Sequence, residues 1–218
     1  MSKLGVISDI HGDVNALRTA LHLLRQQGAD QIVCTGDLVE GHPQNDAVVK
    51  LIIENHIPSV LGNHDQNAAY VHNWLHENHA EHTLSPKVLM QLETARYVGG
   101  LPRTLRLTID GFDLLVAHGA PWDNTVSALA TESRDLFERI AHEAEADVVL
   151  LGHTHRPMAV RVGITWVFNP GSVFNNRPPY LWNTRREHSC GLLSLPDCRF
   201  TVFNLHTGEA LVPEPVIF

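Results

Sequence analysis

The chain has few of the residues that mark secreted and membrane proteins. Its 218 residues include three cysteines, Cys34, Cys190 and Cys198, an odd number that suggests no disulfide framework. No uninterrupted apolar run approaches the roughly 20 residues of a membrane span. The first residues, up to Asp9, lack the apolar core and cleavage site of a signal peptide. We therefore expect a cytoplasmic protein that does not bind a membrane.

Positive charge is also scarce. Lysine and arginine together number 16 against 24 aspartates and glutamates, so the formal net charge is −8. Because a sequence-independent grip on a nucleic-acid backbone depends on basic side chains, we expect no such binding. A nucleotide-like substrate stays open, since bound metal ions would invert the local field. Nothing in the composition indicates the oligomeric state.

Histidine is the abundant residue, with 15 copies, nearly as many as lysine and arginine combined. It is the commonest metal ligand and the usual acid or base near neutral pH. The composition is otherwise ordinary, and 218 residues fit one α/β domain with a sizeable core. Composition alone does not distinguish a metalloenzyme from a histidine-rich chain, so the positions of the histidines have to decide.

The first 65 residues alternate between apolar runs and helical spacings. Residues 3–8, 30–34 and 57–61 are predicted strands, and residues 13–27 and 45–55 are predicted helices between them. This alternation is typical of βαβ units and a parallel sheet. Later segments also favour strands, with Asp110-Gly111 as a hairpin turn between residues 104–109 and 112–117. A long helix is predicted over 125–145, a strand over 147–151, and short strands near 157–168, 189–195 and 199–205.

Residues 66–97 have no strand-like run. They predict two helices, about 66–79 and 86–96, that form a helical insertion or lid beside the sheet. The segment carries His72, His76, His79 and His82, of which the first three share one helical face. A solvated or substrate-facing surface explains this face more simply than a third metal site.

Five predicted strands end in loops that carry aspartate, asparagine or histidine. Ligands of open α/β sheets bind beyond the carboxyl ends of the strands, so these side chains converge if the ends share one edge. Carboxylate, amide and imidazole ligands suit Mn, Fe, Zn, Co or Ni, and the absence of cysteine among them argues against a structural zinc. The predicted metal ligands are Asp9, His11, Asp37, Asn63, His118, His153 and His155.

These loops, taken together, resemble a known family. The segments Asp9-Ile10-His11, Gly36-Asp37, Gly62-Asn63-His64-Asp65, Ala117-His118-Gly119 and Gly152-His153-Thr154-His155 are similar, in order and spacing, to the five motifs of calcineurin-like metallophosphoesterases. The resemblance runs from residue 4 to about 172 and is closest to small single-domain bacterial and archaeal members. It implies an α/β fold: a four-layer α-β-β-α sandwich of two mixed sheets, over residues 1–218 as one domain.

The resemblance also implies a function and a division of the ligands. It implies hydrolysis of a phosphodiester or nucleotide-type phosphate ester by in-line attack of a metal-bridging hydroxide, with two divalent ions, Mn²⁺ first and Fe, Zn, Co or Ni as alternatives. Asp37 would bridge the ions, because two cations close together repel and a shared anion offsets that. Carried over by position, Asp9, His11 and His155 hold the first ion, and Asn63, His118 and His153 hold the second.

His64 is the remaining histidine of these motifs, and the resemblance places it near the leaving group. Its expected role is general acid or cationic stabiliser of the transition state. Such a histidine needs an orienting carboxylate, for which Asp65 and Glu40 are the candidates. The expected catalytic residues are His64, Asp37 and Asp65.

One departure from the wider family bears on the substrate. Phosphoprotein phosphatases read Gly-Asp-x-x-Asp-Arg-Gly, whereas this chain has Glu40-Gly41-His42 and lacks that arginine. A diester is therefore expected ahead of a monoester, although Arg156, Arg177, Arg185 or Arg186 could replace the missing group. A phosphomonoesterase or phosphoprotein phosphatase remains one alternative. A protein-interaction scaffold on the same fold is another, although no ligand position is lost here.

Overall fold

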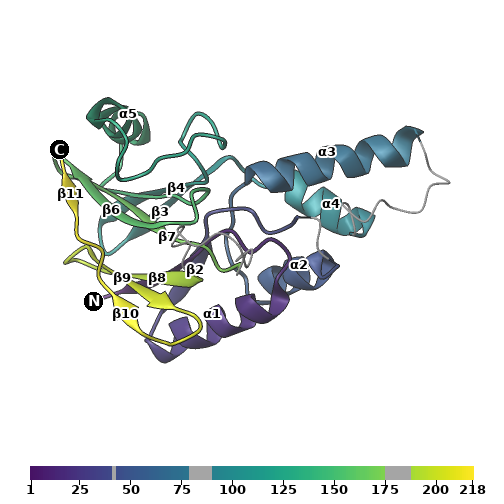
Figure 1. Ribbon diagram of the computed structural model, residues 1–218, viewed down its shortest axis with the longest axis horizontal. Coiled ribbons are helices and arrows are strands. Elements are labelled where there is room, and N and C mark those ends of the chain that lie inside the picture. The colour runs from purple at the N-terminus through teal and green to yellow at the C-terminus, as the bar shows by residue number, and fades with distance from the viewer. Residues whose placement is uncertain (41–42, 79–89, 175–187) are drawn as a thin grey trace, which may run out of the picture.

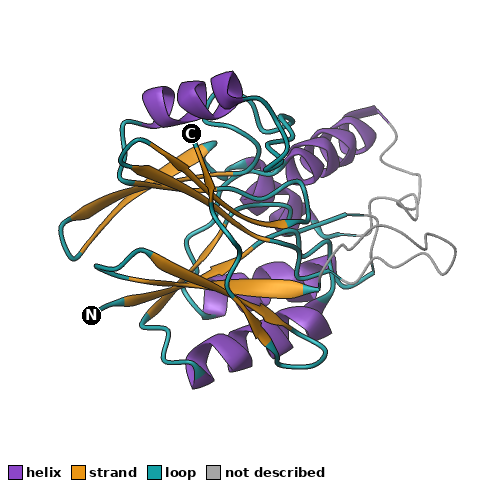
Figure 2. Ribbon diagram, turned by 60° about the vertical axis from the view of Figure 1, so that its left-hand side comes forward, coloured by secondary structure: helices purple, strands orange, loops and turns teal. Residues whose placement is uncertain are grey.

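Two mixed β-sheets stacked face to face form the centre of the molecule, as Figure 2 shows. The computed structural model describes residues 1–40, 43–78, 90–174 and 188–218. The first sheet has the order β10-β9-β8-β1-β2 and the second the order β11-β6-β7-β5-β4-β3. The strands of the first sheet are β1 (Lys3–Ile7), β2 (Gln31–Cys34), β8 (Ser189–Ser194), β9 (Arg199–Asn204) and β10 (Ala210–Leu211). Those of the second are β3 (Thr104–Ile109), β4 (Phe112–Ala117), β5 (Val148–Leu150), β6 (Pro157–Val162), β7 (Thr165–Pro170) and β11 (Val216–Ile217).

Helices cover the outer faces of both sheets (Figures 1 and 2). The helices α1 (Val14–Gln26) and α2 (Asn45–Glu54) lie on the first sheet, and α5 (Arg134–Ala144) lies on the second. The remaining helices, α3 (Asn63–Asn78) and α4 (Leu92–Gly99), pack against each other, and α4 also contacts α2. The predicted four-layer α-β-β-α sandwich is confirmed. Among the described helices, none is long and apolar enough to cross a membrane.

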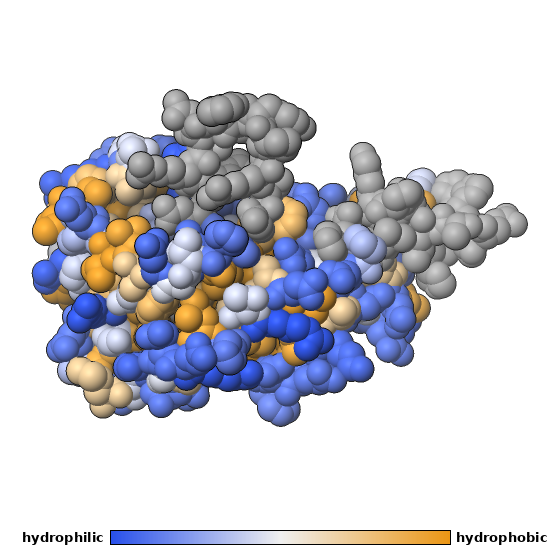
Figure 3. Space-filling model, turned by 60° about the horizontal axis from the view of Figure 1, so that its bottom comes forward, coloured by the Kyte–Doolittle hydropathy of each residue, from blue (hydrophilic) through white to orange (hydrophobic). Residues whose placement is uncertain are grey.

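The buried apolar residues form three clusters, one between each pair of layers. Strand β1 shows how the sequence produces them, since successive side chains of a strand point to opposite faces. Leu4 and Val6 lie in the cluster between the sheets, and Ile7 lies in the cluster under α1. A strand buried on both faces has to be apolar at nearly every position, which is why the run was recognisable. On the face shown in Figure 3, hydrophilic residues surround scattered hydrophobic ones.

Most predicted elements are present, but one predicted strand is not formed and three helices begin at other residues than predicted. Residues 57–61 form a single bridge between Ser59 and Cys34 rather than a strand. Pro58 has no N–H to donate, and the Leu61 N–H donates to the Pro102 carbonyl at 2.8 Å rather than to β2.

The helix predicted over 125–145 begins only at Arg134. The Asp123 carboxylate accepts hydrogen bonds from the backbone N–H and hydroxyl of Thr125, at 2.8 and 2.7 Å. This local turn competes with helix formation at the point where the apolar spacing begins. The Asp110-Gly111 hairpin between β3 and β4, by contrast, is confirmed.

The helices of the 66–97 segment are confirmed in type and shifted in position. Helix α3 begins at Asn63, so three motif residues lie in its first turn rather than in a loop. Helix α4 begins at Leu92, and Asp46 of α2 accepts hydrogen bonds at this end from the Gln91 N–H and the Thr94 hydroxyl. This contact comes from a distant part of the chain. His79, His82 and residues 86–89 lie outside the described residues, as do Gly41, His42, Arg177, Arg185 and Arg186.

Candidate metal centre

The predicted ligands lie beyond the carboxyl ends of strands from both sheets and at the start of α3. Asp9 and His11 follow β1, and Asp37 follows β2. From the second sheet, His118 follows β4, and His153 and His155 follow β5, while Asn63 is the first residue of α3. The structure brings all seven together.

The loops after β1 and β2 run side by side and are joined by backbone hydrogen bonds. The Asp37 carbonyl accepts from the N–H groups of Ile10 and His11, at 2.8 and 3.0 Å. The second sheet is connected to the loop after β1 by the His153 N–H, which donates to Asp9 Oδ2 at 3.1 Å. Helix α3 is connected to the loop after β2 by the His64 N–H, which donates to Asp37 Oδ1 at 2.9 Å. The two carboxylates therefore position the backbone of two further segments, the loop after β5 and the start of α3.

Backbone strain is concentrated at this edge of the sheets. Nine of the described residues other than glycine have positive φ, and five of them are predicted ligands: Asp9, His11, Asp37, His153 and His155. Residues in this region cost of order 1–3 kcal/mol each and persist only where the surroundings fix them. The conformation turns successive side chains toward one point.

Two glycines let the backbone approach the carboxylates closely. A Cβ on Gly62 would overlap the side chain of Asp37, and a Cβ on Gly152 would overlap the Ser8 hydroxyl and lie 3.1 Å from Asp9 Oδ2. Both glycines precede motif residues. Their role here is to leave space for Asp9 and Asp37.

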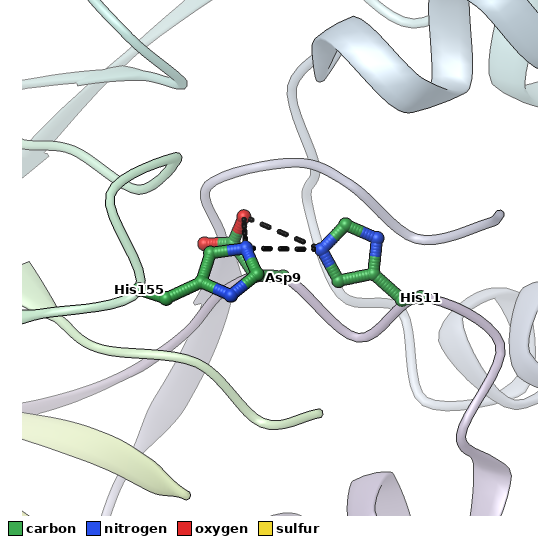
Figure 4. A group of neighbouring side chains, drawn as sticks. All are labelled: Asp9, His11 and His155. Carbon is green, nitrogen blue, oxygen red and sulfur yellow. Dashed lines mark hydrogen bonds and ion pairs between the residues drawn. The ribbon is translucent and has the colours of Figure 1, made fainter. Parts of the chain in front are cut away.

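The first group of ligands consists of Asp9, His11 and His155 (Figure 4). Asp9 Oδ1 lies 3.1 Å from His155 Nε2 and 3.7 Å from His11 Nε2, and these two nitrogens are 3.1 Å apart. Among the described residues, none gives this buried oxygen a well-directed hydrogen bond. A buried carboxylate oxygen of this kind is costly unless a cation satisfies it. Two imidazole nitrogens and a carboxylate oxygen that face one point fit a divalent transition metal.

The second group centres on the side-chain oxygen of Asn63. Asn63 Oδ1 lies 3.0 Å from His118 Nε2 and 2.9 Å from His153 Nδ1. The other ring nitrogen of His118, Nδ1, lies 2.8 Å from the Thr35 carbonyl and donates to it. A carbonyl partner of this kind fixes the tautomer and leaves the opposite nitrogen directed at the centre, as in metal sites.

Asp37 lies between the two groups. Its Oδ2 is 3.2 Å from His118 Nε2, in the second group, and 3.9 Å from His11 Nε2, in the first. Asp37 is 1% exposed, and Asp9 and His118 are fully buried. Asp37 therefore borders both groups of ligands, and its bridging role stays a prediction.

Charge in this buried cluster favours cations. Burial by itself would lower the pKa of His11, but the nearby Asp9, Glu40 and Asp37 carboxylates outweigh it and raise the pKa to about 10. Burial likewise opposes the positive charge of His118, yet Asp37 raises its pKa to about 9. Burial also opposes ionisation of Asp9, but His11 and His155 hold its pKa well below its usual range. Without metal, protons on imidazoles supply the positive charge that the carboxylates require.

Glu40, rather than Asp65, lies against His64. Glu40 Oε1 is 3.3 Å from His64 Nδ1, and Oε2 is 3.2 Å from His11 Nδ1. Both oxygens of the buried Asp65 instead accept backbone N–H groups, from Val39 at 3.0 Å and Gly62 at 3.1 Å. Burial and the nearby Asp37 raise the pKa of Asp65 to about 7. The structure thus gives Asp65 a loop-holding position, which differs from the catalytic role predicted for it.

A cavity of about 300 Å³ opens over the cluster. Its lining consists of His11, Asp37, Glu40, His64, His153, Thr154, His155 and Phe174. Thr154 and Phe174 were not singled out from the sequence. Thr154 could have been, since it lies between two predicted ligands, but Phe174 is remote from every ligand motif in the chain. No lysine or arginine is among these described lining residues.

Helical residues 66–78 and 92–97 do not contribute to the described lining of this cavity. Within the same segment, His72 is buried in α3 and is separate from the ligand cluster. The lid over the site therefore stays a prediction.

Comparison with known proteins gives relatives in sequence as well as similar solved structures. The chain is 26% identical to the uncharacterised protein MJ0912 of Methanocaldococcus jannaschii over 163 residues, which cover 72% of this chain and 63% of that protein. It is 28% identical to the phosphodiesterase YfcE of Escherichia coli K12 over 179 residues, or 79% of this chain and 80% of that protein. A metallophosphoesterase structure from Sphaerobacter thermophilus superposes with a TM-score of 0.68 at 21% identity, covering 98% and 88% of the two chains.

The family itself follows from a match along most of the chain. Residues 2–185 match the model of the calcineurin-like phosphoesterase superfamily domain. The matched range contains every predicted metal ligand, and the two-sheet architecture agrees with that of the superposed structure. The chain belongs to the calcineurin-like phosphoesterase superfamily.

Proposed function

We propose that the protein is a metal-dependent phosphoesterase that hydrolyses a phosphodiester or nucleotide-type phosphate ester with two divalent ions, Mn²⁺ first among the candidates. The observation that carries the proposal is Asp9 Oδ1. It is buried without a directed hydrogen bond from any described residue, and the ring nitrogens of His155, His11 and His118 face it at 3.1, 3.7 and 4.0 Å. The family membership and the phosphodiesterase relative favour the same activity.

The two groups of side chains divide the ligands in the proposed enzyme. Asp9, His11 and His155 hold one ion, and Asn63, His118 and His153 hold the other, with Asp37 between them. When bound, two such ions lower the pKa of a shared water and offset negative charge on the phosphoryl oxygens during in-line displacement. The Thr35 carbonyl keeps His118 in the tautomer that a ligand needs.

His64 supplies the proton in this proposal. Its Nδ1 faces Glu40, so its Nε2 is left to hold the proton that the leaving-group oxygen takes up. General acid catalysis of this kind contributes about 10²–10⁴-fold. Glu40 orients the ring, and Asp65 holds the loops that place Asp37 and His64.

Metal removal and reconstitution test the proposal. Protein treated with a chelator should be inactive toward bis(4-nitrophenyl) phosphate, and Mn²⁺ or a similar ion should restore turnover. Metal analysis should give two ions per chain at full activity. Undiminished hydrolysis by metal-free protein, or full activity with one ion, would contradict the two-metal proposal.

A diester preference follows from the charge of the cavity. A monoester is a dianion whose terminal oxygens need cationic donors, and the described lining offers only histidine. A diester carries one negative charge, which two ions with Asn63 and His64 can satisfy. We expect kcat/KM for bis(4-nitrophenyl) phosphate to exceed that for 4-nitrophenyl phosphate at fixed metal and pH. A tenfold preference for the monoester would favour a phosphomonoesterase instead.

The domain organisation, cellular location and substrate size are also proposed. We propose one domain over residues 1–218 with residues 66–97 as its helical insertion, a cytoplasmic location, and a small-molecule substrate. A protein-interaction scaffold is the second candidate. It needs no metal ligands, whereas this chain keeps all seven within one cluster.

A further inference from the structure

Among the described residues that line the cavity, Phe174 is the one with an apolar side chain. The other seven are four histidines, two carboxylates and a threonine. Its ring is only partly buried, so part of its apolar face borders a polar space. An aromatic face left against water is unfavourable, and a ligand that covers it gains from that burial.

The position of Phe174 is fixed by the same backbone that holds Asp9. The Phe174 N–H donates to the Asp9 carbonyl at 3.0 Å, and the Val173 N–H donates to the Ser8 carbonyl at 2.9 Å. The Ser172 hydroxyl lies 3.0 Å from the Asp9 carbonyl and 3.1 Å from the Phe174 carbonyl. Val173 is fully buried in the cluster under α1. The backbone of Phe174 is therefore held at a set place beside the site.

Phe174 lies directly beside His11, which is a member of the first group of ligands. The ring centroids of Phe174 and His11 are 5.6 Å apart, with an angle of 62° between the ring planes. The His11 ring also lies 5.0 Å from that of His155 and 4.9 Å from that of His64. A phosphoryl group held by these residues would place one of its ester substituents within reach of Phe174.

The size of the cavity allows for more than a phosphate group. Its volume of about 300 Å³ lies at the lower end of the range, about 300–1,000 Å³, of pockets that enclose small organic ligands. We propose that Phe174 is a specificity-determining residue that stacks on an aromatic or heteroaromatic ring, such as a nucleobase, carried by the phosphate ester. This inference rests on the proposed function for the phosphate and adds the chemistry of the group attached to it.

The test compares two ligands that differ only in the ring. Phenylphosphonate and methylphosphonate contain no ester bond, so binding to Mn²⁺-loaded protein can be measured by calorimetry without turnover. We expect phenylphosphonate to bind about tenfold more tightly, which corresponds to about 1.4 kcal/mol. Phe174→Leu should bring the ratio of the two dissociation constants close to one, and Phe174→Tyr should preserve it. Each ratio is taken within one variant, so partial loss of metal or stability does not affect it.

Two results would overturn the inference. One is an equal affinity of the parent protein for both phosphonates, and the other is an unchanged ratio in Phe174→Leu. The proposed function is tested separately, by hydrolysis of bis(4-nitrophenyl) phosphate with the same Mn²⁺-loaded parent. Hydrolysis without a ring preference would contradict only the role of Phe174, whereas a ring preference without hydrolysis would contradict only the proposed function.

Discussion

The two edges of the stacked sheets use the same backbone conformation in different surroundings. At the edge opposite the site, Asp110 and Gly111 of the β3–β4 hairpin have φ of 51° and 83°, and Gly163 of the β6–β7 hairpin has φ of 58°. A Cβ on either glycine would meet nothing within 4 Å. At the site edge, Asp9 and His153 have φ of 53° and 66°, inside a buried cluster.

The difference shows what determines each turn. A hairpin turn with open space depends on residues that tolerate positive φ, so its sequence is enough to explain it. Positive φ still costs energy for aspartate and histidine, and at the site edge the conformation is held by hydrogen bonds between segments far apart in the chain. Substitutions at the two edges should therefore differ in both size and kind of effect.

The largest effect is expected from Asp37→Asn. This change removes the charge between the two ligand groups and keeps the size of the side chain. Loss of groups outside the direct ligands of a metal already costs about 10–100-fold in affinity or activity, so we expect a loss of more than about 100-fold. Metal content and kcat/KM should fall together. Full metal occupancy in the variant would contradict the bridging position.

Gly152→Ala should destabilise the site edge through steric overlap alone. The added methyl group would overlap the Ser8 hydroxyl and lie 2.7 Å from Thr35 Oγ1. Overpacking of this kind costs about 1–3 kcal/mol, and we expect the upper end because several buried groups would have to move. Chemical denaturation should show the loss, and metal affinity should fall with it, because Asp9 is one of the neighbours.

Gly163→Ala is the matched control at the opposite edge. Its added methyl group meets no atom within 4 Å, so only the positive φ is strained. The free energy of unfolding should fall by about 1–2 kcal/mol, with metal content and kcat/KM unchanged. A loss of metal in this variant would remove the distinction between the edges.

His64→Ala separates an acid from a ligand at the site edge. The variant should keep both ions and slow hydrolysis of esters with poor leaving groups by about 10²-fold or more. Nitrophenyl esters need less protonation and should lose less. Equal losses on both ester types would make His64 a charge stabiliser, and loss of metal would make it a ligand.

The smallest expected effect is the release of protons from His11 and His118 when metal binds. With pKa values raised to about 10 and 9, His11 and His118 hold protons at pH 7 in the metal-free protein. A metal ligand must be neutral imidazole, so binding releases these protons. Metal affinity should therefore rise with pH, by up to tenfold per unit for each proton released. Calorimetry at pH 7 in buffers of different ionisation enthalpy counts the protons, and a count of zero would contradict this account.

The sequence predicted those structural features that depend on residues close together in the chain. The apolar run around Val6 predicted a strand buried on both faces, and Asp110-Gly111 predicted its hairpin, since both signals are local. The motif residues that follow the strands were found together for the same reason. The helix predicted from 125 failed because the turn of Asp123 with Thr125 overrode the apolar spacing.

The sequence by itself indicated most of the strands and helices in their order, although not β10 or β11, together with the sandwich that the family motifs imply and the seven polar residues that gather at one edge. Only the tertiary structure decided that Glu40 faces His64, that Asp65 holds backbone instead, that Asp46 bonds to the start of α4, and that Phe174 lies beside His11. Each of these contacts joins segments whose separation is set by how the two sheets and their helices pack. The residues around each partner carry no local pattern that specifies such a distance.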